Sequence, residues 1–290
     1  MRIQTFSIVV GTEACNARCP FCISKQTTDA GVPGNMALQE RQRIDRNFKK
    51  SCRLAQLCGC VTTLLTGKGE PTLFPDEILG YLTLMEKYDF PRIELQTNGI
   101  RLANRSLDTQ LEWWYDRGLT TIALSMIHWN DEINKSVYGS ERKYNLADLT
   151  KLLHEMGFFV RWSVTMLDGY IHNSDTALEM IREAKRNKVE QLTLRQAMAT
   201  ETTRNAQVNE WVRKHALVNT EVDGIVNFLG HQGTKLMTLP HGAMVYDFEG
   251  QNVCLTDCMT ANPDGDDIRT LIFFPDGQTR YDWRYEGATL

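Results

Sequence analysis

The sequence lacks the long apolar segment that a membrane-spanning helix requires. No uninterrupted apolar run approaches ~18 residues, and the opening stretch MRIQTFSIVVGTEA becomes polar too early for a secretory signal. Long runs of one charge are absent as well, because the formal net charge of −4 is spread along 290 residues. We therefore expect neither a polybasic membrane patch nor a basic nucleic-acid surface, and we predict a cytoplasmic protein.

The eight cysteines do not suit a small disulfide-stapled domain, because clustered cysteines in a cytosolic chain more often bind metal or do redox chemistry. They form three groups: Cys15, Cys19 and Cys22; Cys52, Cys58 and Cys60; and Cys254 and Cys258. The second group lies in and just after the helical pattern RQRIDRNFKKSCRLAQL, where cysteine commonly packs as a small apolar residue. We expect packing from the second group and chemistry from the first.

Strand-length apolar segments alternate with amphipathic segments through the first 215 residues. Strands are expected near residues 5–11, 61–67, 92–99, 120–127, 158–167 and 190–197, followed in turn by helices near residues 37–57, 75–88, 107–118, 146–157, 174–188 and 205–216. Six such units require a parallel sheet with right-handed crossovers. An open doubly wound sheet and a partial barrel of six units both satisfy the pattern, and a full barrel would need eight units.

The sequence changes character after residue 215. The stretches GAMVYDFEGQNVCLTDC and RTLIFFPDGQTRYDW are strand-like runs interrupted by EGQN and PDGQ, which are hairpin signals. We predict that residues 1–215 form the α/β part and that residues 216–290 form a small β-rich C-terminal extension that caps it.

The stretch CNARCPFC, residues 15–22, follows the first predicted strand directly. The C-terminal ends of parallel strands are where α/β proteins build their active sites. A structural zinc site commonly uses two paired C-x2-C motifs, and the sequence has no second pair. Three cysteines on a [4Fe–4S] cluster leave one iron open to a ligand. The pattern favours a reactive iron–sulfur centre, and a non-catalytic iron–sulfur or zinc protein is the alternative from another class.

The spacing C-x3-C-x2-C, with Phe21 before the last cysteine, resembles the signature of the radical S-adenosylmethionine (radical SAM) enzymes. The resemblance implies a [4Fe–4S] cluster on Cys15, Cys19 and Cys22. Its open iron would chelate the amino and carboxylate groups of S-adenosylmethionine. A partial (β/α)6 TIM-like barrel is also implied, and it matches the six units counted from hydrophobic periodicity.

The stretch TGKGEPTL, residues 66–73, ends the second predicted strand. Its glycines permit close approach of the backbone to a ligand, and Glu70 offers a carboxylate. The stretch is similar to the family's GxGEP element, which implies that Gly67, Gly69 and Glu70 hold the amino group of S-adenosylmethionine. Lys68 is expected to be solvated, and a substrate contact is its alternative.

Polar side chains at the ends of later strands are further candidates for binding S-adenosylmethionine. Thr97 and Asn98, in LQTNG, resemble the family's strand-three element, although Asn98 and the following glycine could be simple turn chemistry. Ser125 and Ser163 stand where family members often place a serine, and a hydroxyl bonded to backbone is the alternative. Arg195 interrupts an apolar strand and would pair with a ligand carboxylate or phosphate, or with a neighbouring acid.

Cys254 and Cys258 leave three possibilities open. Several radical SAM subfamilies carry at least three extra cysteines near the C-terminus, whereas this chain has two. An auxiliary cluster would need a further ligand. A dithiol or a hydrogen-atom donor is the second possibility, and packing within the β-rich extension is the default.

The resemblance implies that flavodoxin or ferredoxin reduces the cluster and that S-adenosylmethionine is then cleaved to a 5′-deoxyadenosyl radical. That radical would abstract a hydrogen atom from a small-molecule substrate, such as a nucleotide, sugar or amino-acid derivative. A peptide- or protein-modifying maturase, or a glycyl-radical activase, is the alternative. The run of motifs most resembles the molybdenum-cofactor-biosynthesis-like branch.

Overall fold

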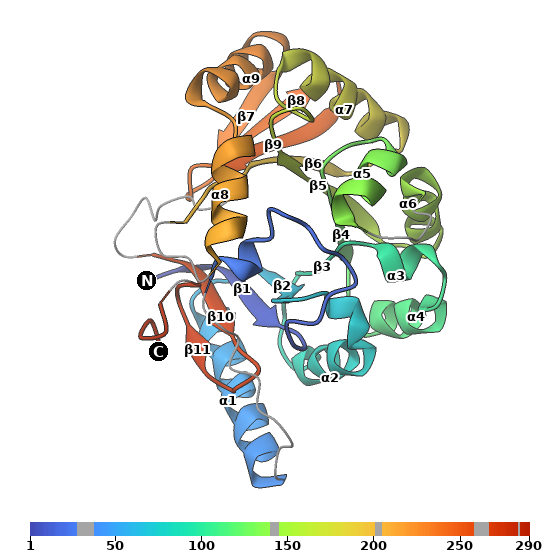
Figure 1. The fold of residues 1–290 in the computed structure, drawn as a ribbon. Coiled ribbons are helices and arrows are strands. Elements are labelled where there is room, and N and C mark those ends of the chain that lie inside the picture. Colours follow the sequence, from blue (N-terminus) through green and yellow to red (C-terminus); the bar gives the residue numbers. More distant parts are fainter. Residues whose placement is uncertain (28–37, 140–144, 201–204, 258–266, 284) are drawn as a thin grey trace.

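The computed structural model describes residues 1–27, 38–139, 145–200, 205–257, 267–283 and 285–290. The strands in these ranges join one curved sheet in the order β11-β10-β1-β2-β3-β4-β5-β6-β9-β8-β7 (Figure 1). Among the helices in the same ranges, none combines the length and the apolar character needed to cross a bilayer.

The six predicted βα units are confirmed. The strands are β1 (Ile3–Val9), β2 (Thr62–Thr66), β3 (Arg92–Thr97), β4 (Thr121–Met126), β5 (Phe159–Met166) and β6 (Gln191–Gln196). The predicted helices are α1 (Leu38–Leu57), α2 (Pro75–Met85), α4 (Asp108–Asp116), α6 (Leu146–Glu155), α7 (Ser174–Arg186) and α8 (Ala206–His215). Short segments that the pattern did not indicate are η1 (Ile23–Lys25), η2 (Pro71–Leu73), α3 (Ile100–Ala103) and α5 (Asp131–Tyr138).

Strand order decides between the two architectures that the sequence pattern left open. A doubly wound sheet reverses its order partway, whereas β1 to β6 lie in sequence order and pair in parallel throughout. Because parallel crossovers are right-handed, an unreversed order places the helices on one face, and the sheet curves around the other. Figure 1 shows α2, α4, α6 and α7 outside this curve. The fold is therefore the partial TIM-like barrel.

The C-terminal strands lengthen both edges of the barrel sheet. β9 (Gln251–Asp257) lies parallel to β6, and β10 (Ile268–Phe273) lies parallel to β1. Both predicted hairpins are confirmed, since β8 (Met244–Phe248) pairs antiparallel with β9, and β10 pairs antiparallel with β11 (Thr279–Arg280). β7 (Thr234–Thr238) pairs with β8 at the edge. The division of the chain at residue 215 stays a prediction.

One helix of the C-terminal region was not predicted. α9 (Asn219–Gln232) buries Ile225 and Leu229, which lie four residues apart on one face. Gly224 and Gly230 lie within the same helix, and glycine is a poor helix former. The glycines weaken the helical pattern of this segment, which lies within the extension predicted to be β-rich.

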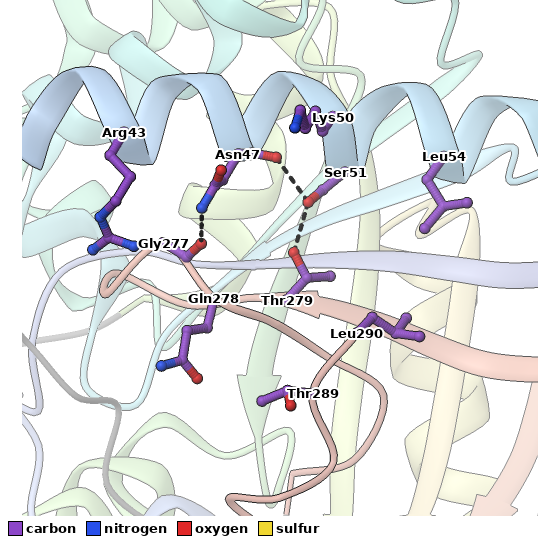
Figure 2. A pocket seen from close by; sticks show the side chains of 10 residues that line it. All are labelled: Arg43, Asn47, Lys50, Ser51, Leu54, Gly277, Gln278, Thr279, Thr289 and Leu290. Carbon is purple, nitrogen blue, oxygen red and sulfur yellow. Dashed lines mark hydrogen bonds between the residues drawn. The ribbon is translucent and has the colours of Figure 1, made fainter.

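The C-terminal hairpin lies along α1. The hydroxyl groups of Ser51 and Thr279 form a hydrogen bond of 2.7 Å, and the side-chain amide of Asn47 donates to the carbonyl of Gly277 at 3.1 Å (Figure 2). A pocket follows this contact, and the residues that line it include none of the predicted site residues. We therefore interpret the pocket as a packing seam between α1 and the hairpin.

The two faces of the barrel sheet differ in polarity. Trp162 donates from its indole nitrogen to Thr150 of α6 at 3.1 Å, so its side chain points outward. Successive side chains of a strand alternate between faces, and Arg161 and Ser163 therefore point inward. Register extends this inner face to Ala123, which pairs with Arg161. The interior carries charged and hydroxyl groups where a closed barrel is packed with apolar layers.

A buried ion pair joins β3 to β5 across the barrel interior. Glu94 of β3 is 2% exposed and accepts from Arg161 of β5. Arg92 approaches the same carboxylate at 3.4 Å, and the Gln96 amide donates to it at 3.2 Å. Ala123 of β4 lies between β3 and β5, and its small side chain lets Arg161 reach across. The pair therefore joins two strands that are not neighbours in the sheet.

Replacing Arg161 with Met should destabilise the fold by about 3 to 5 kcal/mol, because it leaves a buried carboxylate without its main cation. The double variant Arg161→Met/Glu94→Met should lose less stability, since neither buried charge remains. Urea denaturation measures the free energy of unfolding of both variants. Arg182→Met is the control, because Arg182 pairs with Glu179 at the surface, where a pair contributes under about 1 kcal/mol. Equal losses for Arg161→Met and Arg182→Met would contradict the role assigned to the interior pair.

Candidate active site

The cysteine loop leaves β1 through a turn that requires glycine. Gly11 has φ +69°, and a Cβ there would lie 2.1 Å from the ring of Phe74. Its amide donates to Glu77 of α2 at 2.9 Å. The loop is therefore anchored on α2 before it reaches the first cysteine. Cys15 is exposed and Cys19 and Cys22 are half-buried, and all three are free thiols.

The three thiols of the loop are neighbours. Burial, together with the charges of Cys22 and Cys15, raises the pKa of Cys19 to about 12. The described residues contain no group of at least three His, Cys, Asp or Glu side chains arranged to hold one metal ion. A [4Fe–4S] cluster takes one cysteine on each iron, so its ligands need not meet at one point. Three adjacent free thiols on one loop fit such a cluster better than a zinc ion.

Glu70 connects the loops after β2 and β3. It is 3% exposed, and its Oε1 accepts from the Thr72 amide at 3.0 Å, the Thr72 hydroxyl at 2.7 Å and the Thr97 hydroxyl at 2.6 Å. Its Oε2 accepts from the backbone amide of Asn98 at 2.9 Å. Burial raises the pKa of Glu70, and these hydrogen bonds oppose the rise. The carboxylate therefore holds two loops in one arrangement.

Close backbone packing joins the cysteine loop to the loop after β2. The Glu70 amide donates to the carbonyl of Ala14 at 2.9 Å. A Cβ on Gly69 would lie 2.0 Å from that same oxygen, so a larger residue would displace the cysteine loop. A Cβ on Gly67 would lie 3.2 Å from the carbonyl of Val10, which is also tight. Both glycines of the GxGEP element are explained by this packing.

Asn98 links the loop after β3 to the cysteine loop. Its side-chain nitrogen donates to Asn16 at 2.7 Å and lies 3.9 Å from the sulfur of Cys15. Its side-chain oxygen accepts from the amide of Ile100 at 3.0 Å. Gly99 follows with φ +74°. Asn98 therefore makes the predicted turn and also contacts the cysteine loop.

Ser125, Ser163 and Arg195 lie on the inner face of β4, β5 and β6. Ser125 and Ser163 are register partners, and Arg195 is the register partner of Thr165 two residues further along β5. The predicted residues thus form two groups. One group comes from three adjoining loops, and the other faces the barrel interior.

Lys68 is buried, so the expectation that it is solvated is wrong. Its side chain is 4% exposed, its Nζ donates to the hydroxyl of Thr27 at 2.5 Å, and it lies 5.5 Å from the ring centre of Trp283. Burial lowers its pKa to about 8. Trp283 lies more than two hundred residues further along the chain, so no local pattern around Lys68 could indicate this environment.

The other cysteines behave largely as expected. Cys52 and Cys60 are buried in the main apolar core, and Cys58 packs against it. Cys254 is buried on β9 in register with Thr193, so it lies on the inner face. Cys258 lies outside the described residues, and the possibilities for this pair stay predictions.

Comparisons with known proteins agree with the family resemblance and the fold. The Radical SAM superfamily profile matches residues 9–194, more than half of the chain. GTP 3′,8-cyclase of Yersinia pestis is 26% identical over 147 residues, which cover 51% of this chain and 41% of that protein. The Klebsiella pneumoniae enzyme of the same name is 28% identical over 175 residues, covering 59% and 49%. The match thus spans less than half of each relative's length.

Solved structures show the same fold at low identity. SuiB of Streptococcus suis superposes with a TM-score of 0.57 at 15% identity, covering 97% of this chain and 60% of SuiB. Methylornithine synthase, PylB, gives a TM-score of 0.55 at 13% identity, covering 91% and 77%. The order of the cysteine, GxGEP and TNG loops, the partial barrel and the family profile together show that the chain belongs to the radical SAM superfamily of enzymes.

Proposed function

We propose that Cys15, Cys19 and Cys22 hold one [4Fe–4S] cluster and that S-adenosylmethionine binds beside it. When bound, these groups supply the reductive cleavage that yields a 5′-deoxyadenosyl radical, which abstracts a hydrogen atom from a small-molecule substrate. The observation that carries the proposal is the Glu70 network, which joins the loops after β1, β2 and β3 through buried hydrogen bonds. Burying a carboxylate costs free energy, so a junction with only a packing role would be more stable with an apolar residue in place of Glu70.

Glu70 is assigned to the amino group of S-adenosylmethionine. Among the described residues, its Oε2 accepts one hydrogen bond, from Asn98, whereas Oε1 accepts three. Because a carboxylate oxygen has about two lone-pair positions, Oε2 keeps room for an ammonium donor. Gly67 and Gly69 keep the backbone close enough for that contact. Thr97 and Asn98 hold the carboxylate in place.

The inner face of the barrel is assigned to the rest of the ligands. Ser125 and Ser163 present hydroxyl groups at adjoining positions of β4 and β5. Arg195 supplies a guanidinium suited to a carboxylate or phosphate. A polar interior favours a nucleotide, sugar or amino-acid derivative over an apolar substrate. GTP 3′,8-cyclases are named for a nucleotide, and their similarity to this chain supports that class.

An electron must reach the cluster from outside the chain. Flavodoxin or ferredoxin is the proposed donor, and the proposed location is the cytoplasm, where both the donor and reduced thiols are available.

Anaerobic reconstitution with iron and sulfide should yield about four irons per chain, and dithionite with S-adenosylmethionine should then give 5′-deoxyadenosine. Cys19→Ala should give none, because the cluster loses one of its three ligands. The matched control is Cys58→Ala, which removes a half-buried thiol of the core and should retain the product. Chromatography measures the product.

Wild-type protein that holds a full cluster but makes no 5′-deoxyadenosine would overturn the proposed reaction. It would favour the iron–sulfur protein without catalysis. Tightly bound zinc that added iron does not displace would favour a non-catalytic zinc protein.

Replacing Gly69 with Ala should lower the iron content of the reconstituted protein, because the new Cβ collides with Ala14 and displaces the cysteine loop. Gly80→Ala is the control. A Cβ at Gly80 of α2 meets nothing within 4 Å, and glycine to alanine in a helix stabilises by up to about 1 kcal/mol. Iron analysis and circular dichroism separate cluster loss from unfolding. Full iron content in folded Gly69→Ala would show that the close contact is not needed.

A further inference from the structure

Two buried cations, Lys68 and Arg280, lie near each other beside the end of β1. Lys68 is 4% exposed and Arg280 is 6% exposed. A buried charge is costly unless its hydrogen-bonding groups are satisfied. The contacts of each cation therefore indicate whether it is there to stabilise the fold or to meet a ligand.

The ammonium of Lys68 carries three donors. Among the described residues it donates to the hydroxyl of Thr27 and lies over the face of Trp283, and the charge of Glu13 is close enough to raise its pKa. Lys68 lies two residues before Glu70, yet the two side chains contact different segments. Glu70 reaches the loop after β3, whereas Lys68 reaches the end of η1 and the C-terminal segment.

Arg280 is incompletely satisfied. Its Nη2 pairs with Asp276 at 3.3 Å and lies 3.5 Å from the side-chain oxygen of Gln278. Its Nε and Nη1 are buried and have no hydrogen-bond partner among the described residues. The guanidinium carbon lies 4.4 Å from the ring centre of Phe274. Two nitrogens of a nine-tenths-buried side chain thus lack an acceptor among the described residues.

An aromatic pair connects the two cations. The rings of Phe274 and Trp283 lie 5.6 Å apart at 64°, with Arg280 on Phe274 and Lys68 on Trp283. Phe274 is buried with Val9, the last residue of β1, so the stack stands next to the start of the cysteine loop. Burial lowers the pKa of Lys68, the charge of Glu13 opposes that shift, and the charge of Arg280 is near enough to add to it.

We propose that Lys68 and Arg280 form a subsite for an oxyanion, either the carboxylate or the phosphate of the substrate. The donors of the two cations would bind its oxygens, and the aromatic faces would exclude water and strengthen the contact. The assignment to the substrate rests on the proposed function, because the stack adjoins the cysteine loop. Glu70 points toward the loop after β3, which keeps this subsite separate from the place assigned to the methionine amino group.

Calorimetric titration of the anaerobically reconstituted protein tests the subsite, with sodium phosphate and sodium acetate as separate probes and sodium chloride holding the ionic strength constant. Wild type should bind one of these anions saturably, at one per chain. Lys68→Met and Arg280→Met should each weaken that binding by about tenfold or more, because each removes a charged hydrogen-bond donor. Lys87→Met should bind as wild type does, since Lys87 is exposed. Preference for phosphate or acetate identifies the group.

The melting temperature of Lys68→Met provides a second readout. A lysine kept for binding costs stability, so its replacement by an apolar residue should leave the melting temperature equal or higher. The subsite is overturned if wild type binds neither anion saturably, or if Lys68→Met binds as wild type does and melts lower. The titration does not use cleavage of S-adenosylmethionine, so absence of 5′-deoxyadenosine would overturn the proposed reaction and leave this result intact.

Discussion

Glu70 is a buried carboxylate at the point where three loops meet, and the geometry of the candidate site depends on its hydrogen bonds. Its side chain accepts from Thr72, Thr97 and Asn98, and its amide donates to Ala14 of the cysteine loop. A buried carboxylate is tolerated only when such donors surround it. The same donors therefore satisfy Glu70 and fix the separation of the loops after β1, β2 and β3.

The three loops meet at Glu70 because they follow β1, β2 and β3, which are neighbouring parallel strands of the barrel. Their sequence order brings the three C-terminal ends to one edge, while apolar side chains such as Trp162 hold the outer face against the helices. The inner face is left polar, and the ion pair between Arg161 and Glu94 braces it. A polar interior beside a reactive loop suits a ligand-binding enzyme better than a stability-optimised core, because binding groups are retained at some cost in stability.

Features that depend on local sequence were predictable. Periodicity gave the six βα units, and the cysteine spacing and the GxGEP and TNG elements gave the three loops. α9 was missed because its two glycines weaken the helical pattern. Features that depend on distant contacts were not predictable. Lys68 was expected to be solvated, but the C-terminal segment covers it with Trp283. The contact of Asn98 with Asn16, and the reach of Arg161 over Ala123, likewise exist only once the barrel has formed.

Electron paramagnetic resonance of the reduced, reconstituted protein tests most directly whether Glu70 holds S-adenosylmethionine against the cluster. Spectra of wild type and Glu70→Gln would be compared with and without S-adenosylmethionine. Glutamine keeps the shape of glutamate, but its amide nitrogen cannot accept the hydrogen bonds that the carboxylate accepts. We predict that S-adenosylmethionine changes the wild-type spectrum, and that Glu70→Gln gives a cluster signal that does not change. The same spectral change in both proteins would contradict the central role of Glu70.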